Sequence, residues 1–210
     1  MLEFVIIVES EADFRTATGI AERIFKERGP DWLEDYLTEK FQWSGLESNE
    51  KFTCWKDIKY IIRRAGLESH KSPRPLGYAR NSQRKADVAL ARKALVLTEY
   101  FQRERDIRAV IFIRDLDNQP ERRDGLDQAR DEFGVSQFQI VIGKANPNRE
   151  AWVLNGFEAE DGEYDEITKI QDEIKFDPSI EPHRLRSSKA DTPENRSRNA
   201  KVIFGATDAR

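Results

Sequence analysis

Three short apolar runs have the pattern of buried strands, at residues 4–8, 109–113 and 138–142. Continuous runs rich in β-branched residues are typical of parallel strands that are covered on both faces. Elsewhere the apolar residues recur at helical spacing, which indicates amphipathic helices. The predicted helices span residues 12–28, 82–105, 122–133, 149–154 and 163–175, with two shorter ones near 32–37 and 52–62.

The order of these elements predicts the fold class. A strand, several helices, and then alternating strands and helices are typical of an α/β fold with a mostly parallel sheet flanked by helices. The segment at about 30–80 reads as a helical insertion between the first and second strands of the sheet. We expect one α/β domain over residues 1–175, followed by a polar, basic carboxyl-terminal extension over residues 176–210.

Composition adds expectations about location and partners. The net charge of −4 is mild, so local basic patches matter more for nucleic-acid binding than the sum does. Cys54 is the only cysteine, which excludes a disulfide within the chain and fits a reducing cytoplasm. The first residues lack the basic region of a signal peptide, and no apolar run approaches a membrane span. We therefore expect a cytoplasmic protein without a membrane segment.

Two of the predicted strands end in acidic residues. Glu9 follows the first apolar run, and Asp115 and Asp117 follow the second. Sites in α/β folds form at the carboxyl ends of parallel strands. Two carboxylates on one side of an extended chain repel each other unless a cation lies between them, and Mg²⁺ and Mn²⁺ prefer oxygen ligands. The pattern predicts a metal site, with a solvated turn and, for Glu9, a helix-terminal anion as the alternatives.

A metal ion held by carboxylates indicates phosphoryl chemistry. Such an ion polarises a phosphoryl oxygen and activates water. The transition state gains negative charge, which a nearby cation stabilises. Lys144, which follows the third apolar run, is the candidate for that cation, and an ordinary solvated loop lysine is the alternative.

A basic stretch without any acidic residue spans residues 69–86. Its cations are suited to a phosphate backbone, and Tyr78 is available to stack on a base. The candidate nucleic-acid contacts are Lys71, Arg74, Arg80, Arg84 and Lys85. A second basic cluster lies between His183 and Lys201. A solvated loop and an ordinary tail are the alternatives for the two stretches.

Two motifs resemble those of the Toprim domain, the fold shared by topoisomerases, bacterial primases and the overcoming-lysogenization-defect nucleases. They are Val8-Glu9-Ser10-Glu11-Ala12-Asp13 before a helix, and Ile113-Arg114-Asp115-Leu116-Asp117. The resemblance covers residues 1–20 and 106–155. Residues 147–154 resemble the Glu-Ala-Trp helix of small Toprim-like proteins, which often occur beside predicted ATPases of defence systems. Ser10 stands where the family usually has Gly, so this turn needs a negative φ.

The resemblance implies a Toprim/Rossmann-like fold and a metal-dependent nuclease that cuts DNA or RNA with Mg²⁺ or Mn²⁺. It further implies an anti-phage defence effector that works with an ATPase partner. By position, Glu9 would be a metal ligand or general acid/base, and Asp115 and Asp117 would be metal ligands. Glu150 would add a carboxylate, and Asp13 would hold the Glu9 turn or a metal-bound water. For Glu150 and Asp13 a helix surface charge is the alternative.

Two other functions remain open. A regulatory or binding subunit would keep the Toprim fold without cleavage. A phosphatase of the haloacid dehalogenase type also uses Asp-x-Asp after a strand, but Asn118 stands where that family normally has Thr or Val, and its motif usually lies on an early strand. A topoisomerase or primase would need further domains.

Overall fold

The computed structural model describes residues 2–29, 41–68, 87–134, 136–155, 164–186 and 200. Its strands are β1 (Leu2–Val8), β2 (Phe41–Ser44), β3 (Thr53–Cys54), β4 (Ile107–Asp115) and β5 (Gln139–Ala145). Its α-helices are α1 (Glu11–Arg28), α4 (Ile58–Arg64), α5 (Val88–Phe101), α6 (Pro120–Phe133), α7 (Arg149–Asn155) and α8 (Tyr164–Ile174), and 3₁₀ turns span Trp55–Asp57 and Pro182–Arg184. Within these segments, no helix has both the length and the apolar character that a membrane span requires.

The strands form one sheet in the order β2-β1-β4-β5, and β3 also pairs with β1. β1 runs parallel to β2, β3 and β4, and its residues from Val5 to Val8 are buried. A strand with neighbours along both edges and apolar residues on both faces is the centre of a parallel sheet. The predicted α/β fold with a parallel sheet is confirmed.

The segment between β1 and α5 corrects one prediction. We expected a helical insertion, but β2 and β3 lie in this segment and join the sheet, with Leu2 opposite Phe41 and Val8 opposite Cys54. The helix predicted near 52–62 begins only at the 3₁₀ turn of Trp55. Apolar runs this short fit the period of a helix as well as that of a strand. Pairing with β2 and β3 satisfies backbone groups along one edge of β1, which a helix in this segment would leave unpaired. The helix predicted near 32–37 lies outside the described residues.

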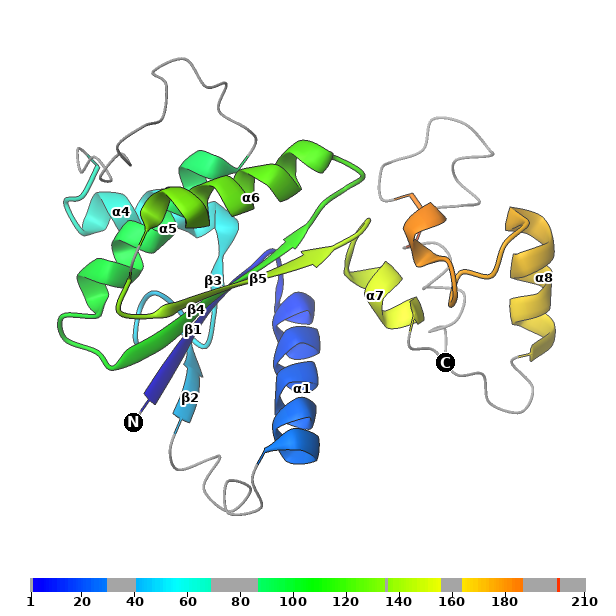
Figure 1. Cartoon of the computed structure of the whole chain (residues 1–210), viewed down its shortest axis with the longest axis horizontal. Helices are drawn as coiled ribbons and strands as arrows, with labels where there is room; N and C mark the ends of the chain where they lie inside the picture. Colours follow the sequence, from blue (N-terminus) through cyan, green and yellow to red (C-terminus); the bar gives the residue numbers. More distant parts are fainter. Residues whose placement is uncertain are drawn as a thin grey trace. The chain divides into compact units, whose positions relative to one another are not determined.

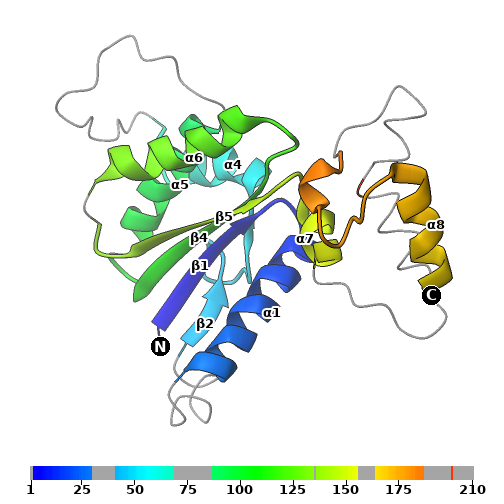
Figure 2. The same cartoon turned by 45° about the vertical axis from the view of Figure 1, so that its right-hand side comes forward.

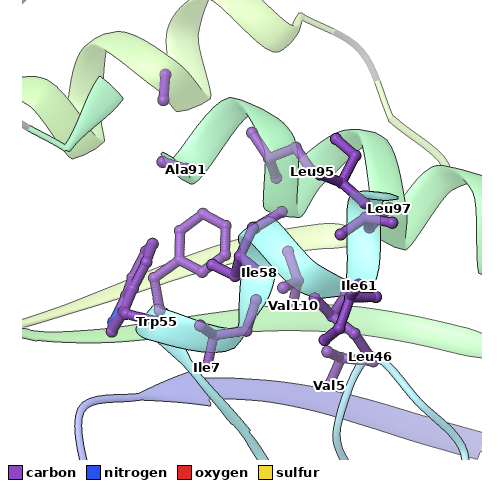
Figure 3. Close-up of a cluster of buried hydrophobic side chains, with 14 of the residues drawn as sticks. Val5, Ile7, Leu46, Trp55, Ile58, Ile61, Ala91, Leu95, Leu97 and Val110 are labelled. Carbon is purple, nitrogen blue, oxygen red and sulfur yellow. The ribbon is translucent and has the colours of Figure 1, made fainter. Parts of the chain in front are cut away.

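Helices cover both faces of the sheet, with α4, α5 and α6 on one face and α1 on the other (Figures 1 and 2). Side chains alternate between the faces along each strand. Val5 and Ile7 therefore belong to the larger core, whereas Ile6 and Val8 belong to a smaller cluster with Phe14 of α1. Figure 3 shows part of the larger core, including Val5, Ile7, Trp55, Ile58, Ile61, Leu95, Leu97 and Val110.

The chain divides into two compact units. The first comprises Met1–Arg114 and Glu121–Gly143, and the second comprises Asp115–Pro120 and Lys144–Arg210. The second unit has its own buried cluster, made of Ala151, Leu154, Ile174, Phe176, Leu185 and Ala200. Because residues on both sides of position 175 are buried together in this cluster, the division differs from the predicted boundary between 1–175 and 176–210.

Candidate functional site

The two acid-ended strands are neighbours in the sheet. Glu9 follows β1 directly and Asp115 is the last residue of β4. β1 and β4 pair in parallel, with Ile7 opposite Phe112. Both strands therefore present their carboxyl ends at the same edge of the sheet. Glu9 belongs to the first unit, and Asp115 and Asp117 to the second.

The turn after Glu9 is held by a capping box. The Oδ2 atom of Asp13 accepts hydrogen bonds from Ser10 N and Ser10 Oγ, both at 2.8 Å, and Asp13 N donates to Ser10 Oγ at 3.4 Å. Ser10 has φ −151°, an extended conformation that any residue adopts. Ser is therefore compatible with the position where Toprim domains usually have Gly, and it adds a helix cap. Asp13 is buried and holds this turn.

Glu9 lies in a cluster of four charged side chains, Glu9, Asp87, Arg114 and Arg122, which we call the carboxyl-end cluster. Arg114 Nη1 forms an ion pair with Glu9 Oε1 at 2.8 Å. Asp87 accepts two hydrogen bonds from the same guanidinium group, from Nε to Oδ2 at 2.9 Å and from Nη2 to Oδ1 at 3.1 Å. Arg122 is more distant, 4.0 Å from Glu9 and 3.7 Å from Asp87. The residue of β4 that meets Glu9 is thus Arg114.

Trp55 supports Arg114 from the core. Its ring centroid lies 5.4 Å from the guanidinium carbon, within the range of a cation–π contact. Its indole N–H donates to the carbonyl oxygen of Ile113 at 2.8 Å, and its ring packs against Phe112. Phe112 and Arg114 are two residues apart on β4, so they share the face that Trp55 covers.

Sequence reasoning missed three members of the carboxyl-end cluster. Arg114 was part of the quoted motif, and its two-residue spacing from Phe112 was a usable signal, because it predicts an arginine that lies over the buried face. Asp87 and Arg122 lie at the start of two other helices, and no local pattern relates them to Glu9. Only the fold brings these side chains together.

In the second unit, the Asp-x-Asp motif forms a turn. Leu116 N donates to Ala145 O at 2.9 Å, and Asp117 N donates to Pro147 O at 2.8 Å. Asp117 and Asn118 have φ values of 50° and 56°, a left-handed conformation that Asp and Asn tolerate better than most residues. Asp115 therefore still belongs to β4, whereas Asp117 lies in a turn, so the chain is not extended across the whole motif.

The turn is joined to the start of α7. Arg149 N donates to Asp115 Oδ1 at 2.9 Å. Asn148 is fully buried, and its Oδ1 accepts from Ala151 N at 3.2 Å. Glu150 has a side chain that is only 13% exposed, and its Oε1 lies 3.4 Å from Arg149 Nη2. Glu150 is therefore largely shielded from solvent, which does not support the alternative that it is a surface charge on a helix.

Lys144 lies within β5 and does not follow it, because this strand extends to Ala145. It belongs to the second unit together with Asp115, Asp117 and Glu150. In the part of the chain that the structure describes, no three Asp, Glu, His or Cys side chains gather closely enough to hold a metal ion. The metal site made from Glu9, Asp115, Asp117 and Glu150 stays a prediction.

The basic stretches are described only in part. Lys71, Arg74, Arg80, Arg84 and Lys85 lie outside the described residues. In the second stretch, Arg184 pairs with Glu181 at 2.8 Å and lies 4.3 Å from the ring centroid of Phe176. Arg184 therefore contributes to the packing of the second unit.

Cys54 is half-buried in β3, and not in the predicted helix. Burial raises the pKa of its thiol, and the nearby Asp57 raises this pKa further. Since only the thiolate is a strong nucleophile, this supports a packing role for Cys54.

Comparison with known proteins leaves the family of the chain open. No family model, curated protein or solved structure matches it. The likeness to Toprim domains therefore rests on the motifs around Glu9, Asp115 and Glu150.

Proposed function

We propose that this protein is a nuclease that hydrolyses phosphodiester bonds in DNA or RNA and depends on Mg²⁺ or Mn²⁺. The observation that carries the proposal is the parallel pairing of β1 with β4, because Glu9 and Asp115 stand at the ends of these two strands. That edge is where α/β sheets bind ligands. Carboxylate oxygens are the ligands that these cations prefer.

Each candidate residue has a role in the proposal. Asp115 and Asp117 are metal ligands, and Glu150, which lies in the same unit, adds a carboxylate. A bound cation would supply Lewis acidity and an activated water. Lys144 stabilises negative charge on the phosphoryl group in the transition state. Glu9 acts as ligand or general acid/base.

The proposed cellular role is that of a toxic effector in a bacterial anti-phage defence system, acting in the cytoplasm with an ATPase partner. Its support is the resemblance of residues 147–154 to the Glu-Ala-Trp helix of small Toprim-like proteins. The stretch from Lys71 to Lys85 would bind the phosphate backbone. The neighbouring gene tests this role, since an ATPase encoded there would favour it.

A second function is favoured by the contacts of Glu9. Arg114 holds one of its carboxylate oxygens, and no three metal-binding side chains gather within the described segments. Both observations suit a Toprim-like regulatory or binding subunit that does not cleave nucleic acid. In such a subunit, Glu9 would be structural and a partner surface would carry the function.

Cleavage assays separate the two functions. Purified protein is incubated with supercoiled plasmid and with RNA, in Mg²⁺, in Mn²⁺ and in EDTA, alone and with an ATPase encoded beside it. We expect metal-dependent cleavage that falls about a hundredfold or more in Asp115→Asn and is retained in Glu27→Gln, a control at an exposed site on α1. If no condition gives cleavage, and if Glu9→Gln and Asp115→Asn leave phage protection intact, the protein is not a nuclease.

A further inference from the structure

Arg114 is fixed along the whole of its guanidinium group. Nε and Nη2 donate hydrogen bonds to the two oxygens of Asp87, and Nη1 forms an ion pair with Glu9 Oε1. A planar guanidinium presents its donors in a rigid fork, so two contacts to one carboxylate determine where the third donor points. Asp87 therefore sets the direction in which Arg114 meets Glu9.

The indole of Trp55 holds the same guanidinium on its face. Trp55 is itself buried and anchored to the backbone of Ile113, the residue before Arg114. Arg114 is thus restrained by a carboxylate at its edge and by an aromatic ring on its face. These restraints reduce the freedom of a side chain that is otherwise rich in rotamers.

The side chains of the two partners in the ion pair differ in solvent exposure. The side chain of Arg114 is 13% exposed, whereas that of Glu9 is 31% exposed. Glu9 therefore has the most exposed side chain of the carboxyl-end cluster, although its Oε1, which faces Arg114, is buried.

A second arginine cluster in the first unit lacks this asymmetry. Arg105 pairs with Glu3, and their side chains are 10% and 11% exposed. Arg105 also donates to Ser44 Oγ at 2.9 Å and to two backbone carbonyl oxygens. We call Glu3, Ser44 and Arg105 the amino-end cluster. It closes the edge of the sheet and leaves neither partner accessible.

We propose that Arg114 is a positioning residue that orients the Glu9 carboxylate for phosphodiester hydrolysis, and that Asp87 and Trp55 fix Arg114 for this task. The inference rests on the proposed function, in which Glu9 takes part in the reaction. It assigns a role to Arg114, which lies within one of the acidic motifs, and adds Asp87 and Trp55, which those motifs do not contain. Arg122, at about the outer limit of an ion pair, adds positive potential near the same carboxylate.

The test compares Arg114→Lys with Arg105→Lys, the same substitution at the opposite edge of the sheet. A lysine offers one compact ammonium group and cannot bridge Asp87 and Glu9 as the guanidinium fork does. We expect Arg114→Lys to lower kcat about tenfold to a hundredfold with little change in KM. Asp87→Asn, which keeps the shape of the side chain, should lower kcat in the same direction. Arg105→Lys should lower Tm and retain wild-type kcat at a temperature where it is folded.

Each result has a distinct meaning. Circular dichroism of every variant at the assay temperature establishes that it is folded, and Asp87→Asn replaces Arg114→Lys if the latter does not fold. An active wild type together with unchanged kcat in Arg114→Lys and Asp87→Asn would overturn the positioning role alone. An equal fall of kcat in Arg105→Lys would also overturn it, because the effect would then be general. A wild type that is inactive under every condition, together with intact phage protection in Glu9→Gln and Asp115→Asn, would overturn the proposed function, and with it the positioning role.

Discussion

The two edges of the sheet in the first unit carry the same pair of residue types and use them differently. At the amino edge, Arg105 is bound by Glu3, a hydroxyl and backbone carbonyl oxygens. At the carboxyl edge, Arg114 is bound by two carboxylates and an indole, and the side chain of Glu9 is partly exposed. An arginine–glutamate pair is therefore not by itself evidence of stability or of function. What surrounds the pair decides which role it has.

The largest expected effect is at the amino edge. Arg105→Ala leaves the buried carboxylate of Glu3 without its cation and leaves the carbonyls of Gly45 and Leu46 without this donor. Removing one partner of a buried ion pair costs about 3–5 kcal/mol. Urea denaturation should show a loss of this size, against less than about 1 kcal/mol for Arg108→Ala, whose pair with Asp106 is exposed. Equal losses would mean that the amino-end cluster does not stabilise the sheet.

A matched pair of substitutions sharpens the comparison directly. Glu3→Gln should lower the free energy of unfolding by about 2–3 kcal/mol, because the hydrogen bonds to a buried charged arginine are weakened. Glu9→Gln should lower it by less than about 1 kcal/mol, because Glu9 is partly exposed and Arg114 retains Asp87. Urea denaturation of both variants measures the difference. The reverse order would contradict the assignment of stability to the amino edge.

Trp55→Phe tests the support beneath Arg114. It keeps an aromatic ring but removes the N–H that donates to Ile113 O, so we expect a loss of about 1–2 kcal/mol. Trp43→Phe removes an indole hydrogen bond to the exposed side chain of Glu22 and should cost about 0.5 kcal/mol or less. Thermal or urea unfolding provides both values. Indistinguishable values would mean that the bond from Trp55 to Ile113 does not anchor the carboxyl-end cluster.

The smallest effects are expected at Ser10, which holds the turn after Glu9. Ser10→Ala removes the cap of α1 and should cost about 1 kcal/mol, whereas Ser10→Gly should cost only a few tenths, about 0.3 kcal/mol. Chemical denaturation distinguishes the two variants. A stabilising Ser10→Gly would mean that the backbone of this turn is strained with serine, contrary to its extended φ.

The sequence predicted the parts of the fold whose patterns are long or continuous. β1, β4 and β5 were recognised from apolar runs, and α1 was recognised from helical spacing. In the structure, α1 begins directly after the capping box at Ser10. β2 and β3 were missed because they have four and two residues, too few to establish a period of two. They pair with one edge of β1, and no local sequence pattern predicts which segment will pair there.

The candidate site was predicted in a similar way. Glu9 and Asp115 were predicted at the ends of strands in a common, mostly parallel sheet, and the pairing of β1 with β4 shows that these two strands are neighbours. The conformation of Asp117 was not predicted, since Asp and Asn suit both turns and metal-binding loops. Asp87 was missed because it reaches Arg114 from a position 27 residues away in the sequence.

By itself, the sequence determined the longer strands β1, β4 and β5 and the helices α1, α5, α6, α7 and α8, which of their faces are apolar, and which strands end in acid. These properties follow from residue type and spacing alone. Only the tertiary structure decided that Glu9 meets Arg114, and that Asp87 and Trp55 hold this arginine. The reason is physical: the register of β1 against β4 and the alternation of side chains choose which residue faces Glu9, and both depend on contacts between segments far apart in the chain.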